Sequence, residues 1–215
     1  MIAEIIFENE RLLALNKASG VHTLRGKDSS SSNLQDWLEA QRPSQSQLLE
    51  SGFLQRLDYL TSGCILAAKD EKSFLEFKQK MKQSDFFEKI YLVVTEKLIE
   101  NQETSFYFQS RYRSSKKISV SDFGDPKDLG KTKIELLHSQ KDYFVYQANI
   151  VGGGKRHQIR ASFAKLGAPI VGDPLYGGSE SRFFGLHSWR LECPDFQMLA
   201  RPPFASLFSA LNLSN

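Results

Sequence analysis

Ten residues early in the chain, 54–63 (LQRLDYLTSG), place a carboxylate directly before an apolar segment. Residues 64–68 (CILAA) have the composition of a buried strand, and Thr61, Ser62 and Gly63 turn the chain into it. A carboxylate just before a core strand is rigidly placed, so Asp58 is a candidate nucleophile or base. The alternative is that Asp58 caps a turn and pairs with Arg56 at the surface.

A second region, residues 152–178 (GGGKRHQIRASFAKLGAPIVGDPLYGG), combines glycines, basic side chains and a Gly-Asp-Pro turn. Residues 156–166 place apolar side chains on one face of an expected helix, which Gly167 ends. The glycines before this helix leave backbone N–H groups where a phosphate can bind. The segment is not a nucleotide-binding P-loop, because neither Ser nor Thr follows Lys155.

Together these two regions resemble the RluA-type family of RNA pseudouridine synthases. In that family the catalytic segment reads Arg-Leu-Asp-x-x-Thr-Ser-Gly, and the later segment reads Gly-Arg-x-His-Gln-Ile-Arg followed by Pro-Ile-x-Gly-Asp-x-x-Tyr-Gly. The match extends to residues 12–21 (LLALNKASGV), 89–94 (KIYLVV) and 186–194 (LHSWRLECP), so it covers nearly the whole chain. The resemblance implies one α+β catalytic domain over residues 1–215, without an N-terminal S4 domain. Its sheet is mixed and mostly antiparallel, with flanking helices and a central basic cleft.

The resemblance also implies a function: isomerisation of specific uridines to pseudouridine in structured ribosomal or transfer RNA, without a cofactor. It assigns Asp58 as the catalytic residue and Arg160 as the guanidinium that holds it as an anion. Tyr91 matches the tyrosine that stacks on uracil and relays a proton. Without the resemblance, Arg160 reads as a helix-surface arginine and Tyr91 as a packing residue of a strand. The route that Asp58 follows, through the sugar or through the base, stays open.

Charge is distributed unevenly along the chain. Lys and Arg number 28 against 25 Asp and Glu, a net charge of +3, but residues 111–117 and 155–160 are strongly basic. Two such clusters on one face attract phosphates despite the modest total. The residues expected to bind RNA are Arg56, Arg111, Arg113, Lys116, Lys117, Lys155, Arg156 and His157. For each of them, a solvated surface charge is the alternative.

Three positions depart from the family pattern. Ala18 stands where the family usually has proline, Gln55 where it has histidine, and Lys155 where it has arginine. These departures motivate a second hypothesis, a catalytically silent RNA-binding module on the same scaffold. A third hypothesis, a glycosidase acting on small nucleosides, requires a second acid, and none lies near Asp58 in the sequence.

Composition and spacing make other classes of protein improbable. The four histidines are scattered and no paired-cysteine spacing occurs, so no metal site is expected. The two cysteines, Cys64 and Cys193, lie in apolar surroundings, which is typical of a reducing compartment. Because neither a signal peptide nor a membrane span is visible, we expect a cytoplasmic protein without membrane contact, and a monomer.

Apolar periodicity predicts the main elements. Residues 3–7 and 12–16 form a hairpin, and Asn33 caps a helix over 34–41. A second helix begins near Asp70 and buries Phe74 and Phe77. Strands are expected at residues 64–68, 90–98, 104–108, 131–137 and 143–151, with polar loops at 25–33 and 112–130.

Overall fold

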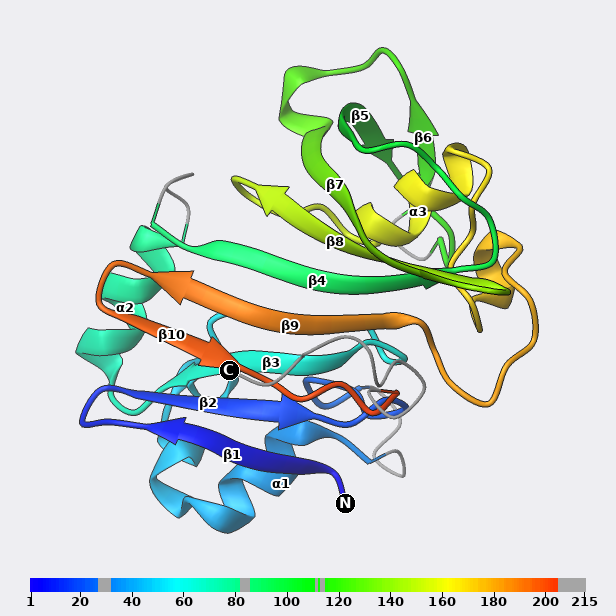
Figure 1. The fold of residues 1–215 in the computed structure, drawn as a ribbon. Helices are drawn as coiled ribbons and strands as arrows, with labels where there is room; N and C mark the ends of the chain where they lie inside the picture. The colour runs from blue at the N-terminus through cyan, green and yellow to red at the C-terminus, as the bar shows by residue number, and fades with distance from the viewer. Residues whose placement is uncertain (27–31, 82–85, 111, 113–114, 205–215) are drawn as a thin grey trace.

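The computed structural model describes residues 1–26, 32–81, 86–110, 112 and 115–204, and these residues form one ten-stranded sheet (Figure 1). The strand order is β1-β2-β3-β9-β4-β8-β7-β5-β6, and β10 pairs with β9 beside this path. All described strand pairs are antiparallel except β3 with β9. The expected α+β fold with a mixed, mostly antiparallel sheet is therefore confirmed.

The strands are β1 (Ala3–Glu8), β2 (Leu12–Lys17), β3 (Ser62–Ala68), β4 (Glu88–Thr95), β5 (Gln102–Gln109), β6 (Ser119–Ser121), β7 (Leu129–Gln140), β8 (Tyr143–Val151), β9 (Leu186–Cys193) and β10 (Phe196–Leu199). The α-helices of the described residues are α1 (Leu34–Gln41), α2 (Glu71–Lys80) and α3 (Gln158–Lys165). None of these helices has the length and apolar character needed to cross a membrane.

Both faces of the sheet are covered, and the alternation of side chains along β2 shows how. Leu13 and Leu15 belong to a core that also contains residues of α1 and α3. Leu12 and Ala14 point to the other face, where they share a core with Phe74 of α2. The helices α1 and α3 therefore lie on one face, toward opposite ends of the sheet, and α2 lies on the other (Figure 1).

Side-chain caps begin two of the helices; the sequence predicts the cap at Asn33 and, for the second helix, a start near Asp70. The Asn33 side chain accepts the backbone N–H of Asp36 at 2.8 Å, at the start of α1. The Asp70 side chain accepts the N–H of Ser73 at 2.8 Å, at the start of α2. Each cap satisfies one of the backbone donors that a helix leaves unpaired at its N-terminus.

Three predicted boundaries are wrong. The helix expected from residue 156 begins at Gln158, because His157 has a left-handed backbone (φ 54°). The strand expected to reach residue 98 ends at Thr95, whose hydroxyl donates to the Lys97 carbonyl at 2.8 Å. The segment 112–130, expected as a surface loop, includes β6 in its described part. Part of the loop expected at 25–33, residues 27–31, lies outside the described residues.

The Thr-Ser-Gly tail of the first motif brings two distant strands together. Gly63 has φ 111°, and a Cβ there would lie 2.2 Å from the Ser188 carbonyl oxygen. Glycine is therefore required where β3 pairs with β9, with Ser62 opposite His187 and Gly63 opposite Ser188. The buried Ser62 hydroxyl also bonds Nδ1 of His187 at 2.8 Å. These contacts fix the preceding turn, and Asp58 with it, over the middle of the sheet.

Candidate active site

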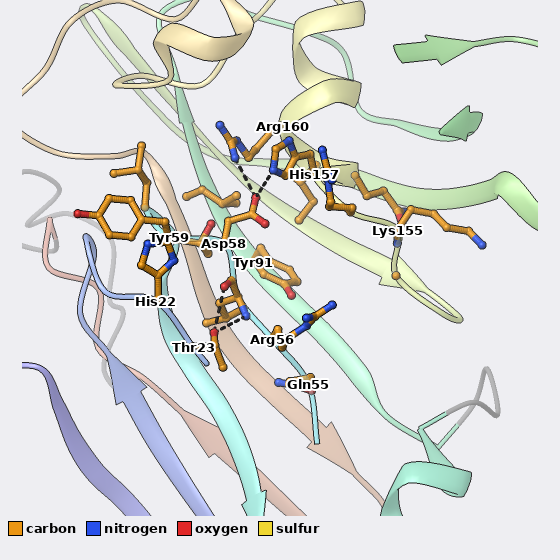
Figure 2. Close-up of a pocket in the computed structure, with 18 of the residues that line it drawn as sticks. His22, Thr23, Gln55, Arg56, Asp58, Tyr59, Tyr91, Lys155, His157 and Arg160 are labelled. Carbon is orange, nitrogen blue, oxygen red and sulfur yellow. Dashed lines mark hydrogen bonds and ion pairs between the residues drawn. The ribbon is translucent and has the colours of Figure 1, made fainter. Parts of the chain in front are cut away.

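A cleft of about 1280 Å³ opens on the face of the sheet that carries α1 and α3 (Figure 2). Residues 22–25, residues 55–61, the start of β4 and residues 154–160 contribute to its walls. Asp58 is the sole acidic residue of the described lining. Seven lining residues are arginines or lysines: Arg25, Arg56, Lys89, Lys116, Lys155, Arg156 and Arg160. The predicted basic cleft is therefore present, although the net charge of the chain is only +3.

Hydrogen bonds to backbone groups fix the turn that carries Asp58. The buried Thr23 hydroxyl accepts the Leu57 N–H at 3.1 Å and donates to the Leu57 carbonyl at 3.0 Å. The Thr61 N–H donates to the Asp58 carbonyl at 3.1 Å. These bonds satisfy both polar backbone groups of Leu57 and the Asp58 carbonyl, and the Asp58 side chain takes no part in them.

A second group of contacts holds the far side of the turn. Lys17 is fully buried, and its Nζ donates to the carbonyls of Ala18, Val21 and Tyr59 at 2.9, 2.8 and 3.3 Å. The Tyr59 carbonyl also accepts the Gly20 N–H at 2.9 Å. Burial lowers the pKa of Lys17 to about 7, and the negative charge of Asp58 opposes this shift.

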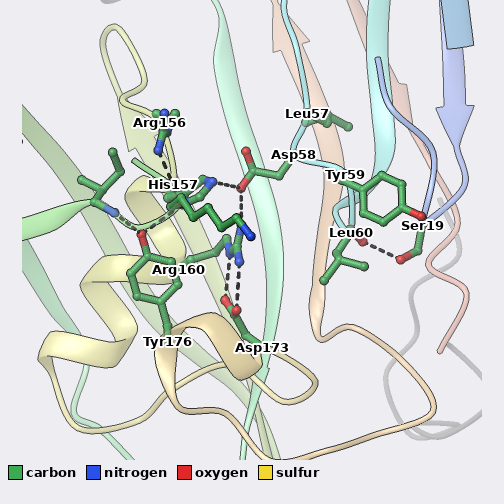
Figure 3. A network of polar contacts seen from close by, with 12 residues as sticks. Ser19, Leu57, Asp58, Tyr59, Leu60, Arg156, His157, Arg160, Asp173 and Tyr176 are labelled. Atoms are coloured by element: carbon green, nitrogen blue, oxygen red, sulfur yellow. Dashed lines mark hydrogen bonds and ion pairs between the residues drawn. The ribbon is translucent and has the colours of Figure 1, made fainter. Parts of the chain in front are cut away.

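One guanidinium connects the turn to the second motif (Figure 3). Arg160 on α3 is buried, and its Nη1 lies 3.0 Å from Oδ2 of Asp58. Its Nε and Nη2 donate to both oxygens of Asp173 at 2.8 and 2.9 Å. Asp173 is 0% exposed, whereas the Asp58 side chain is 26% exposed. Asp173 therefore orients Arg160 by a bidentate contact, and the remaining nitrogen meets Asp58 at the cleft.

His157 approaches Asp58 from the same side. Its Nε2 lies 3.6 Å from Oδ2 of Asp58, and its Nδ1 lies 3.0 Å from the Tyr176 hydroxyl. That hydroxyl accepts the Ile118 N–H at 2.9 Å, so it can donate its own proton to Nδ1. We therefore assign the ring proton to Nε2, facing Asp58. Burial lowers the pKa of His157, a shift that Asp58 opposes and the nearby cations Arg160 and Arg156 reinforce.

Tyr91 lies on β4 and lines the cleft with Asp58. Burial is the main cause that raises the pKa of Tyr91, the negative charge of Asp58 raises it further, and a hydrogen bond with the Ser188 side chain opposes both. The hydroxyl is therefore protonated at neutral pH. Lys89, two residues earlier and on the same side of the strand, also lines the cleft, and burial lowers its pKa.

The structure separates the predicted site residues into groups. Asp58, Tyr91, Arg160 and His157 gather around the cleft floor, and Arg56, Lys116, Lys155 and Arg156 line its walls. Lys117 lies over the Tyr176 ring, with its Nζ 5.1 Å from the ring centroid. Arg111 and Arg113 lie outside the described residues. The roles of all these residues in catalysis and RNA binding stay predictions.

Two alternative sequence interpretations are wrong. Asp58 pairs with Arg160, and no ion pair with Arg56 occurs among the described residues. Arg160 is not a helix-surface arginine, because it is 6% exposed.

The departures at Lys155 and Gln55 are both found in the cleft wall. Lys155 Nζ donates a hydrogen bond to the Lys127 carbonyl, and the Arg156 guanidinium donates one to the Ser115 carbonyl. Each cation is therefore also held by a backbone carbonyl. Neither amide atom of Gln55 has a hydrogen-bond partner among the described residues.

Sequence reasoning missed Asp173, Lys17 and Thr23. The Gly-Asp-Pro turn marks Asp173 as part of a motif. No spacing along the chain reveals that its carboxylate accepts hydrogen bonds from Arg160, thirteen residues earlier. A lysine at the end of an apolar strand is the one sequence signal for Lys17. Among the described residues, no three His, Cys, Asp or Glu side chains gather in a way that suits a metal ion.

Comparison with known proteins adds to this geometry. Residues 11–165 match the model of the family described as RNA pseudouridylate synthase. A protein of Rickettsia bellii named ribosomal large subunit pseudouridine synthase C is 32% identical over 190 residues, which cover 86% of this chain and 61% of that protein. Ribosomal large subunit pseudouridine synthase D of Xylella fastidiosa is 26% identical, covering 82% of this chain and 52% of that protein. The chain thus spans little more than half the length of these relatives.

A solved structure shares the fold. The structure described as human RNA pseudouridylate synthase domain containing 4 aligns with a TM-score of 0.73, covering 97% of this chain and 92% of that one. The two sequences are 17% identical, so this similarity concerns the fold alone.

Proposed function

The chain belongs to the RNA pseudouridylate synthase family, and on that premise we propose that it isomerises uridine to pseudouridine in RNA without a cofactor. The observation that carries the proposal is the ion pair of Asp58 with Arg160 at the floor of a cleft whose other charged lining residues are cationic. A carboxylate in this position has a fixed orientation, and the surrounding cations suit a phosphate backbone.

The reaction exchanges one bond of the uridine for another. The bond from C1′ to N1 breaks, the uracil rotates, and a bond from C1′ to C5 forms, while the proton on C5 is lost and N1 gains one. Asp58 supplies the anion that traps or stabilises the reacting nucleotide. Both described contacts of this carboxylate, with Arg160 and His157, involve Oδ2, and Oδ1 is the oxygen that meets the substrate.

The residues around Asp58 support the same reaction. Tyr91 offers a ring face for the uracil and a protonated hydroxyl for hydrogen bonding or proton relay. Arg160 keeps the carboxylate in place through the cycle, because Asp173 holds two of its nitrogens. The walls of the cleft beside Asp58 would keep the detached base near the sugar.

The target nucleotide must leave its stack to reach Asp58, which costs a few kcal/mol. Arg56, Lys116, Lys155, Arg156 and His157 line the cleft, and they are the residues we propose to bind the phosphates beside it. The names of the relatives make large-subunit ribosomal RNA the first substrate to test. Transfer RNA, which the sequence resemblance also implies, is the second. The proposal includes action as a monomer in the cytoplasm, where the buried Cys64 stays a thiol.

The test is pseudouridine mapping on cellular RNA from cells that lack the gene, after incubation with purified protein. We expect new pseudouridine at specific positions with the wild type and none with Asp58→Ala. Asp122→Ala is the matched control, because this exposed carboxylate pairs with Lys165 at 2.9 Å and does not line the cleft. Equal modification by Asp58→Ala would refute the role of Asp58.

A salt titration of RNA binding, made beside this mapping, tests the silent RNA-binding module. Binding that weakens steeply with salt, together with no pseudouridine on any RNA, would support that alternative and contradict the enzyme. A nucleoside hydrolase is disfavoured by the cleft itself, since Asp58 is the sole acid of its described lining.

A further inference from the structure

Two aromatic side chains at one end of the cleft have no part in the chemistry described above. The rings of His22 and Tyr59 lie 4.5 Å apart between centroids, tilted by 36°. Both residues line the cleft, His22 is exposed, and Tyr59 is 47% exposed. Figure 2 shows them on one side of Asp58, with Tyr91, Arg56 and Lys155 on the other. The aromatic pair and the cations Arg56 and Lys155 therefore lie on opposite sides of Asp58.

The backbone holds this aromatic pair firmly. The Tyr59 carbonyl accepts from both Lys17 Nζ and the Gly20 N–H. The His22 carbonyl accepts the Leu34 N–H at 2.7 Å, at the start of α1. The two rings thus come from separate segments, each tied to the sheet or to a helix. A stacking surface that is already ordered loses little conformational entropy when a ligand binds.

An exposed aromatic pair beside an RNA cleft has a physical use. Each base has a flat π face, and stacking on aromatic side chains is a sequence-tolerant way to hold nucleotides that have left a helix. Everting one uridine unstacks the nucleotides next to it, and their exposed faces need a partner. Tyr59 follows Asp58 directly in the chain and both residues line the cleft, so a base beside the target is the ligand that this ring can meet.

We propose that Tyr59 and His22 form a stacking platform for the base that neighbours the target uridine. The proposal rests on the RNA-modifying function proposed above and extends it to a residue pair that positions the substrate. Arg56 and Lys155, on the other side of Asp58, are the cations that would hold phosphates. The platform would bind bases, and these cations would bind the RNA backbone.

The competing explanation is that the Tyr59 ring merely packs the loop that carries Asp58. A ring that packs contributes through its size and apolar surface, whereas a ring that stacks on a base contributes through its π face. Leucine keeps much of the apolar bulk without the π face, and phenylalanine keeps the π face without the hydroxyl. Tyr59→Leu and Tyr59→Phe therefore separate the two explanations.

The experiment measures the affinity of the wild type, Tyr59→Phe, Tyr59→Leu and His22→Leu for two labelled ten-residue probes by fluorescence anisotropy. One probe is oligouridylate, and the other has the same length and phosphates but tetrahydrofuran residues in place of nucleosides. Phe123→Leu is the control, because Phe123 is exposed and lies outside the cleft lining. Thermal unfolding of each variant checks that the loop stays folded.

We expect Tyr59→Leu to weaken oligouridylate binding about tenfold and to leave binding of the base-free probe unchanged. Tyr59→Phe and Phe123→Leu bind both probes like the wild type, and His22→Leu shows a smaller loss confined to oligouridylate. Equal losses on both probes, or no loss on either, would overturn the platform. Binding is read without turnover, so a wild type that makes no pseudouridine but shows this pattern refutes the enzymatic proposal alone.

Discussion

The turn that carries Asp58 and the helix that carries Arg160 meet in one ion pair, but different kinds of contact hold them. The turn is fixed through its backbone, by the Thr23 hydroxyl and by the Nζ of buried Lys17. The helix is fixed through its side chains: Arg160 grips Asp173, and Gln158 donates to the Thr132 hydroxyl at 2.9 Å.

This difference shows how the site separates stability from chemistry. Because the turn needs none of its own polar side chains for its shape, Asp58 and Tyr59 remain partly exposed in the cleft. Arg160 and Asp173, in contrast, are buried and each depends on the other for charge compensation. Substitutions in the turn should therefore alter function, and substitutions at the helix should alter the fold.

The largest effect on stability is expected at Asp173, the partner that holds Arg160 of α3. Asp173→Asn removes one partner of a buried ion pair and leaves the Arg160 charge with Asp58 alone, which should cost about 3 kcal/mol. Urea unfolding followed by circular dichroism measures this loss. A destabilisation below about 1 kcal/mol would show that the helix does not depend on this pair.

A smaller effect is expected where the turn meets its backbone anchor. Thr23→Val removes a hydroxyl that serves both the N–H and the carbonyl of Leu57, so it should destabilise the protein by about 2 kcal/mol. Thr23→Ser keeps the hydroxyl and should recover most of the loss in the same urea titration. Equal losses for Val and Ser would indicate that packing of the Thr23 methyl group, and not the anchor, holds the turn.

Asp58→Asn should change the free energy of unfolding by less than about 1 kcal/mol, since this side chain is partly exposed and does not shape the turn. Measured beside Asp173→Asn, it contrasts two carboxylates that share one guanidinium. Similar destabilisation by the two substitutions would contradict the division between turn and helix.

The smallest effect concerns pH. Burial lowers the pKa of His157 below its usual 6.5, so below pH 6.5 the unfolded chain binds a proton more readily than the folded protein. Above pH 6.5 His157 has no effect of this kind on the free energy of unfolding. As the pH falls from 6.5 to the pKa of His157 in the folded protein, its protonation in the unfolded chain lowers that free energy. His157→Gln should lose less stability than the wild type between pH 7 and 5. Parallel pH profiles of the two proteins would refute this assignment.

Local structure was readable from the sequence, and long-range assembly was not. The hairpin, the Asn33 cap, the helix start near Asp70 and the apolar strand after Gly63 follow from patterns within a few residues. The pairing of Asp58 with Arg160 is predicted from the family motifs. Their shared partner Asp173 and the buried Lys17 depend on which strands lie side by side, and periodicity carries no such information. The left-handed backbone of His157 before α3, and the contacts of its ring with Asp58 and Tyr176, are likewise absent from the sequence pattern.

The most direct test of the proposed catalytic role compares binding and chemistry in Asp58→Asn on the RNA fragment identified by mapping. We predict an RNA dissociation constant within about twofold of the wild type, and a single-turnover rate of pseudouridine formation lower by at least about a thousandfold. A rate within tenfold of the wild type would contradict the claim that the carboxylate held by Arg160 performs the reaction.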